Sequence, residues 1–169
     1  MTQSKTLRRW ELALLLGVAL AALLGVWLDG AQAALSDRVI RLHVLANSDS
    51  EADQALKLRV RDAVLAEAEE LFVPGAGRAE TEELLRAHLY DLAAAGAEVV
   101  GEAGYSYPVT ASLVHDYWFP PKTYTDFALP AGAYTALRIE IGAGGGQNWW
   151  CVVFPPLCLG SVSETTQET

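Results

Sequence analysis

The chain has 169 residues, of which 51% are hydrophobic and 20% charged, and its formal net charge at pH 7 is -9. This length and composition predict one packed domain and exclude a wholly disordered chain. The acidic balance argues against a nucleic-acid partner, because binding to a phosphate backbone needs clustered Lys and Arg, and it disfavours adsorption to an anionic membrane surface.

The first 33 residues have the pattern of a secretory signal peptide. Lys5, Arg8 and Arg9 precede the uncharged, mostly apolar residues 12–28, and the small-x-small motif that signal peptidase accepts follows at residues 31–33. We expect cleavage after Ala33. An uncleaved anchor is the alternative, because the apolar run is at the lower limit for spanning a bilayer. In either case the positive N-terminus directs the rest of the chain out of the cytoplasm, and the membrane is contacted only through this segment.

Hydrophobic periodicity predicts a strand followed by two helices in the next part of the chain. Apolar and polar residues alternate over residues 39–45, as in a strand with one buried face. Ser50 is the predicted N-cap of a helix over residues 51–72, whose apolar residues recur at spacings of three and four. A second helix is expected over residues 81–104, and Gly96 allows a break inside it.

The last third of the chain has the alternation of strands. They are expected at residues 109–113, 137–141 and 149–154, and the small polar residues 161–169 read as a tail. The order of elements predicts an α+β fold, with two helices packed on a mostly antiparallel sheet, for a single domain over residues 34–160.

The sequence has no spacing typical of a metal or nucleotide site. The glycine-rich residues 142–146 do not match a phosphate loop, because the third glycine of that motif would fall on Gln147 and a strand follows where a helix is needed. His43, His88 and His115 show no metal-ligand spacing. We therefore expect neither a metal nor a cofactor.

The two cysteines, Cys151 and Cys158, would lie outside the cytoplasm, where a disulfide between them is permitted, and buried free thiols are equally compatible with the sequence. A thiol beside Trp149 and Trp150, with a distant histidine as base, also allows an exported cysteine-dependent hydrolase that uses Cys151. The position of Cys151 inside a predicted strand argues against a nucleophile.

Adjacent Trp149 and Trp150 must point to opposite faces of their strand. One of them can fill the core while the other reaches solvent or a binding partner, because Trp is a frequent interface anchor.

Several ordered blocks resemble the stage II sporulation protein R family, and the likeness covers roughly residues 39–160. The opening block is matched by IRLHVLANSDS and DQALKLRVRDAV, the middle block by YPVT and FPPKTY, and the closing block by LPAGAYTALRI and GQNWWCVVFPPLC.

The resemblance implies an exported, non-enzymatic signalling protein of endospore formation. In that family the protein acts in the intermembrane space between forespore and mother cell, where it triggers a membrane-embedded aspartic protease that processes the sigma-E precursor. No catalytic residue comes with this role. From their polar or aromatic character we expect the partner to contact His43, Asn47, Asp49, Gln147, Asn148 and Trp149. A passive envelope scaffold is a further alternative.

Overall fold

The computed structural model describes residues 8–124 and 127–157, and the chain divides into two compact units, Met1–Leu35 and Ser36–Thr169. The predicted tail at residues 161–169 lies outside the described residues.

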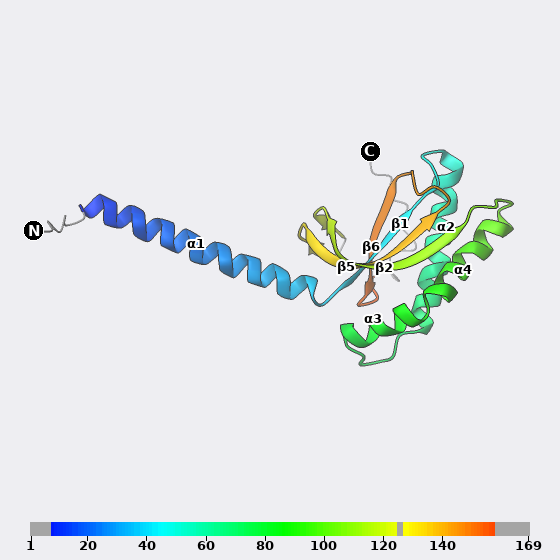
Figure 1. Ribbon diagram of the computed structural model, residues 1–169, viewed down its shortest axis with the longest axis horizontal. Helices are drawn as coiled ribbons and strands as arrows, with labels where there is room; N and C mark the ends of the chain where they lie inside the picture. The colour runs from blue at the N-terminus through cyan, green and yellow to red at the C-terminus, as the bar shows by residue number, and fades with distance from the viewer. Residues whose placement is uncertain (1–7, 125–126, 158–169) are drawn as a thin grey trace, which may run out of the picture. The chain divides into compact units, whose positions relative to one another are not determined.

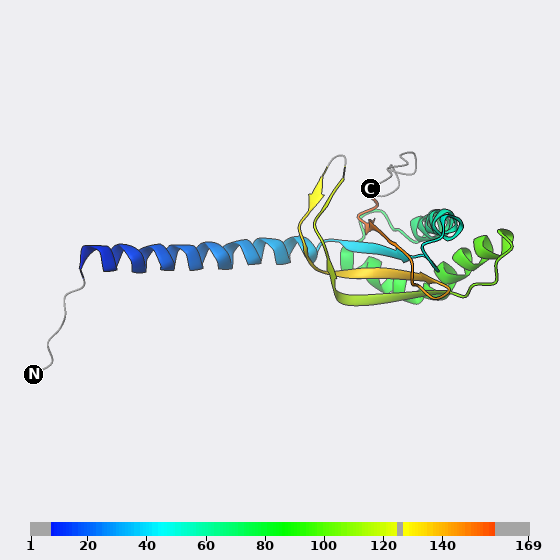
Figure 2. The same ribbon diagram turned by 90° about the horizontal axis from the view of Figure 1, so that it is seen from above.

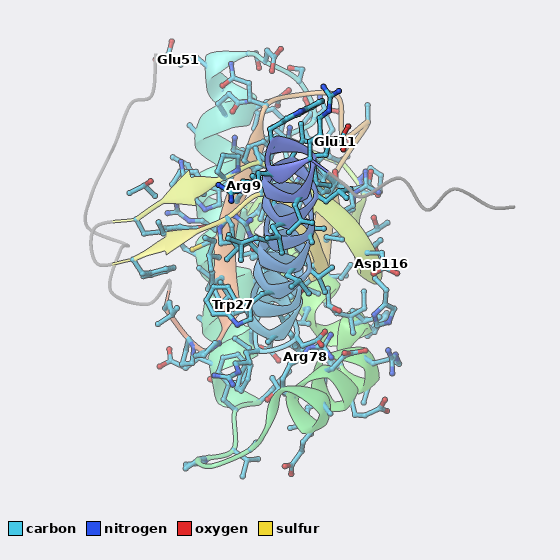
Figure 3. The ribbon with its side chains drawn as sticks, turned by 90° about the vertical axis from the view of Figure 1, so that its left-hand side faces the viewer. Arg9, Glu11, Trp27, Glu51, Arg78 and Asp116 are labelled. Carbon is cyan, nitrogen blue, oxygen red and sulfur yellow. The ribbon has the colours of Figure 1, made fainter. Side chains whose placement is uncertain are left out.

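The described residues of the first unit form one long helix, α1 (Arg9–Ser36). Its segment Arg9–Trp27 has a mean hydropathy of 2.0 and none of it is buried, so by length and composition it can cross a membrane. Figure 3 looks along this helix and shows its side chains, Trp27 among them, spreading outward from the axis. A signal sequence near an N-terminus has the same properties, and the alternative between cleavage and anchoring therefore stays open.

The second unit is built on a four-stranded mixed sheet in the order β2-β5-β1-β6. Strand β1 runs parallel to β5 and antiparallel to β6, and β2 runs antiparallel to β5. The strands are β1 (Ile40–Leu45), β2 (Val109–Phe119), β5 (Gly132–Ile141) and β6 (Asn148–Phe154). Strands β2 and β5 are longer than the alternation predicted, because their pairing continues to Phe119 and Gly132.

Three helices complete the body, and the predicted α+β class is confirmed. They are α2 (Glu51–Glu70), α3 (Arg78–Ala87) and α4 (Leu89–Glu102). Ser50 caps α2 as predicted, since its Oγ accepts a hydrogen bond from the backbone N of Asp53 at 3.2 Å. The second predicted helix is divided at His88 and not at Gly96. Gly96 stays inside α4 because a Cβ there would lie 3.0 Å from Val109 Cγ1 and 3.1 Å from Val60 Cγ1, so it allows close packing.

The two faces of the sheet differ in whether helices cover them. One face, which we call the helix-covered face, carries Leu42 and Val44 and packs against α2 and α4, where Val60 and Val64 are fully buried. The opposite, helix-free face carries Arg41 and His43, since successive side chains of a strand alternate. All six residues of β1 are nevertheless buried, including these two polar ones.

A short arm covers part of the helix-free face. It consists of β3 (Lys122–Thr123) and β4 (Ala128–Leu129), which pair with each other and prolong the β2–β5 hairpin beyond a break. Pro120, Pro121 and Pro130 lie at this break, where a residue without an N–H cannot continue the ladder. Figure 1 shows the arm at one end of the strands, away from α2 and α4, and Figure 2 shows the arm turning away from the strands.

Candidate functional site

The loop after β1 is tied to the start of α2 by one carboxylate. Asp53, which is buried, accepts hydrogen bonds through Oδ2 from Ser48 Oγ at 2.5 Å and from Asn47 Nδ2 at 2.9 Å. These donors, the Ser48 hydroxyl first, hold the pKa of Asp53 below its usual value because they favour the charged carboxylate. The polar residues that follow β1 therefore stabilise the conformation of their own loop.

The same loop holds the connection between β5 and β6. Asn47 Oδ1 accepts a hydrogen bond from the backbone N of Ala143 at 3.0 Å, and Asp49 Oδ1 accepts one from the backbone N of Gln147 at 2.7 Å. The backbone N of Gly146 donates to the carbonyl of Ala46 at 3.0 Å. The structure thus brings together three of the residues predicted to contact the partner, Asn47, Asp49 and Gln147.

Lys57 of α2 closes this loop cluster from the helix side. Its ammonium donates to the carbonyl of Gln147 at 2.9 Å and to Gln54 Oε1 at 2.7 Å. Burial, with a smaller contribution from the charge of Arg61, lowers the pKa of Lys57. Asp49 and Gln147 remain exposed in spite of these bonds, whereas Asn47 is half-buried.

His43 and Asn148 form a second group on the helix-free face. His43 Nε2 lies 2.7 Å from Asn148 Oδ1, and in this geometry Nε2 carries the proton and donates. Burial lowers the pKa of His43, and the bond to Asn148 only partly offsets this. The His43 ring also packs against Tyr117 and Trp150, with centroid distances of 5.0 and 6.3 Å. Asn148 is exposed, so it is the outer member of this pair.

Trp149 and Trp150 point to opposite faces, as predicted. Trp149 pairs with Val44 on the helix-covered face, where the guanidinium of Arg61 lies 4.5 Å from its ring centroid. Trp150 pairs with His43 on the helix-free face. Both rings are half-buried. Of the six predicted contact residues, Trp149 therefore lies on the opposite face of the sheet from His43.

The helix-free face also holds a residue that the sequence pattern did not single out, Arg41. Its side chain is fully buried, its guanidinium carbon lies 4.0 Å from the Phe119 ring centroid and 5.2 Å from that of Tyr134, and Nη2 donates to the Tyr124 hydroxyl at 3.2 Å. Cation–π contacts of this kind contribute about 2 kcal/mol when desolvated. The alternation in β1 marked Arg41 only as a polar residue pointing away from the core, and a cationic residue in a central strand was the one available signal.

Among the described residues, no carboxylate pairs with Arg41, and its Nε and Nη1 have no hydrogen-bond partner. Burial raises the pKa of Tyr124 and of Tyr134, so both phenols are neutral at physiological pH and supply no counter-charge. A buried charge without a counter-ion costs several kcal/mol as a rough guide. Arg41 is therefore kept in place at a cost to stability.

Cys151 lies on the other side of the sheet from His43. Cys151 is 5% exposed and pairs with Leu42, whereas His43 pairs with Trp150. The side chains of Cys151 and His43 therefore point to opposite faces of the sheet. This arrangement lacks the adjacent base that activates a cysteine nucleophile. Cys158 lies outside the described residues, and the disulfide remains a prediction. The described part of the chain contains no cluster of His, Cys, Asp and Glu that could hold a metal ion.

Comparison with known proteins gives the same family as the blocks in the sequence. The family model described as stage II sporulation protein R matches residues 36–164. The chain belongs to this family. It is also 39% identical over 125 residues to stage II sporulation protein R of Bacillus subtilis (strain 168), which covers 74% of this chain and 55% of that relative. No solved structure gives a significant match.

The family match begins at residue 36, the first residue of the second compact unit. The loop cluster and the helix-free face therefore both belong to the part of the chain that the family shares, whereas α1 ends at the residue where the match begins. The chain is thus a sporulation protein with an apolar N-terminal helix that fits a signal segment.

Proposed function

We propose that this chain is an exported signal of endospore formation that triggers a membrane-embedded aspartic protease, which in turn processes the sigma-E precursor. Membership of the stage II sporulation protein R family is the observation that carries the proposal. The apolar helix α1 supports it independently, because a signal in the intermembrane space between forespore and mother cell must be exported.

A protein ligand activates an enzyme only if it binds the active conformation more tightly than the inactive one. A shift from 1% to 99% active requires about a 10⁴-fold difference in affinity between the two states. The loops that carry Asp49 and Gln147 suit this task, because internal hydrogen bonds fix them and they do not need to order themselves on binding. Asp49, Gln147 and Asn148 are the exposed members of the predicted contact set.

The proposal is tested by deleting the chain in its sporulating host and following the sigma-E precursor by immunoblot. We expect the precursor to accumulate without being processed and the phenotype to be restored by the full-length chain. A strain without the chain that processes the precursor at the normal time would end the proposal.

A further inference from the structure

Three hydrogen-bond donors of Arg41 and Trp150 lie without acceptors on the helix-free face. They are Arg41 Nε and Nη1 and Trp150 Nε1, all buried and none with a partner among the described residues. Arg41 and His43 are neighbours on this face of β1, and Trp150 pairs with His43 from β6. Buried donors are almost always satisfied in native proteins, so a cluster of unpaired donors calls for an acceptor from outside.

The chemistry of these donors points to a carboxylate. A guanidinium presents a planar fork of N–H groups that matches the two oxygens of a carboxylate, and the indole N–H is a further donor that accepts nothing in return. We propose that the helix-free face binds an acidic segment of the protein partner, whose carboxylate accepts hydrogen bonds from Arg41. This inference rests on the proposed function, because it names the chemistry by which the partner recognises the chain.

A protein segment fits this face better than a lipid headgroup. The chain has a net charge of -9, and an anionic bilayer would repel it. Membrane recognition by charge uses clusters of several Lys and Arg, whereas here one guanidinium lies among aromatic rings at Phe119 and Tyr134. Aromatic side chains packed around one cationic side chain are typical of protein–protein interfaces.

The arm provides the access to Arg41. The hydrogen bond that the guanidinium donates goes to Tyr124, which lies between the two strands of the arm. These strands pair over only two residues each, so few backbone bonds oppose a displacement of the arm. A partner carboxylate that replaces the neutral Tyr124 hydroxyl gains a charge-assisted bond in exchange for a neutral one.

The first test uses co-expression of the full-length chain, the protease and a tagged sigma-E precursor. We expect Arg41→Met to reduce processing by about tenfold or more, the effect of losing a charge-assisted hydrogen bond. Arg38→Met, which removes an exposed arginine three residues earlier, should leave processing unchanged. The melting temperature of Arg41→Met should stay equal or rise, because an unpaired buried charge is replaced by an apolar side chain.

Normal processing by Arg41→Met would overturn the inference. So would loss of processing together with a lowered melting temperature, because Arg41 would then have a structural role.

The second test does not depend on the protease. The full-length chain in detergent is titrated with the capped peptide Gly-Glu-Glu-Gly and with its Gly-Gln-Gln-Gly counterpart, and Trp fluorescence is followed. We expect a saturable response to the acidic peptide, and about tenfold weaker binding of the amide peptide or of the acidic peptide to Arg41→Met. Equal binding of both peptides, or Arg41-dependent binding to phosphatidylglycerol vesicles in place of the peptide, would contradict it. If the wild-type chain triggers no processing in the first test, the proposed function fails while this titration still decides the inference.

Discussion

Asp53 is the residue on which the loop after β1 depends most. It joins Asn47 and Ser48 to the first turn of α2, and Asn47 in turn holds the β5–β6 connection. Removal of the charge at Asp53 should therefore loosen two loops at once, including the exposed residues that we propose for partner contact.

We expect Asp53→Asn to lower the melting temperature at pH 7 and to flatten its dependence on pH. The folded pKa of Asp53 lies below the ordinary value of 3.8, so its ionised form stabilises the fold above that pH. This contribution declines as the pH falls below 3.8 and is lost as the pH passes the lower folded pKa. Melting curves of both proteins between pH 7 and pH 3 measure the effect. A constant difference in melting temperature over the whole range would contradict it.

Gly146 provides a sharp test of how closely the two loops approach. A Cβ at this position would collide with the backbone carbonyl of Ser48, whereas one at Gly145 would lie 3.5 Å from the carbonyl oxygen of Asn47, an ordinary contact. We expect Gly146→Ala to reduce the free energy of unfolding by about 1–3 kcal/mol. The matched variant Gly145→Ala should change it by about 0.5 kcal/mol or less. Equal effects in urea denaturation would mean that the loops do not touch in this way.

At the scale of elements, prediction from the sequence was most accurate where residues close together in the chain determine the structure. The Ser50 cap and the apolar stripe of α2 are local signals, and both are present in the structure. The sequence allowed a break in the second helix at Gly96, whereas the break occurs at His88. Gly96 is retained for packing against Val60 and Val109, which come from elements distant in the chain.

The environment of β1 could not be predicted either, because it also depends on elements that are distant in the chain. The alternation in β1 predicts that Arg41 and His43 lie on the solvent-exposed face of the strand, yet both are fully buried. Their cover comes from Phe119, Tyr124 and Trp150, which lie more than 70 residues further along the chain and reach them only through sheet order and the arm. Of the candidate site, the sequence predicted polar groups near the carboxyl end of β1 but not the unpaired guanidinium.

The arm should be the part of the described sheet structure that opens most readily. Two-residue strands have little pairing to lose, whereas β1 is paired on both sides. We expect backbone amides of β3 and β4 to exchange with deuterium at least about 100-fold faster than those of β1 and β5, a difference of roughly 3 kcal/mol in opening free energy. Hydrogen–deuterium exchange with peptide resolution measures this. Equal protection would show an arm that is locked to the sheet.

At the scale of the whole molecule, the proposed function requires a folded signal without chemistry of its own. The buried position of Cys151 and the opposite direction of His43 agree with that. We expect Cys151→Ser and Cys158→Ser to have equal effects on signalling, because the predicted disulfide between the two residues would be lost in both. Processing of the precursor by each variant, with the melting temperature as control for folding, gives the answer. A folded Cys151→Ser that is inactive beside an active Cys158→Ser would support the cysteine hydrolase.

The most direct measurement is reconstitution of precursor processing in a non-sporulating host. The full-length chain, the membrane-embedded protease and a tagged sigma-E precursor are co-expressed, and each is omitted in turn. We predict processing only when all three are present, and none when residues 1–33 are removed so that the body stays in the cytoplasm. Processing without the chain, or undiminished processing with the retained body, would contradict an exported trigger.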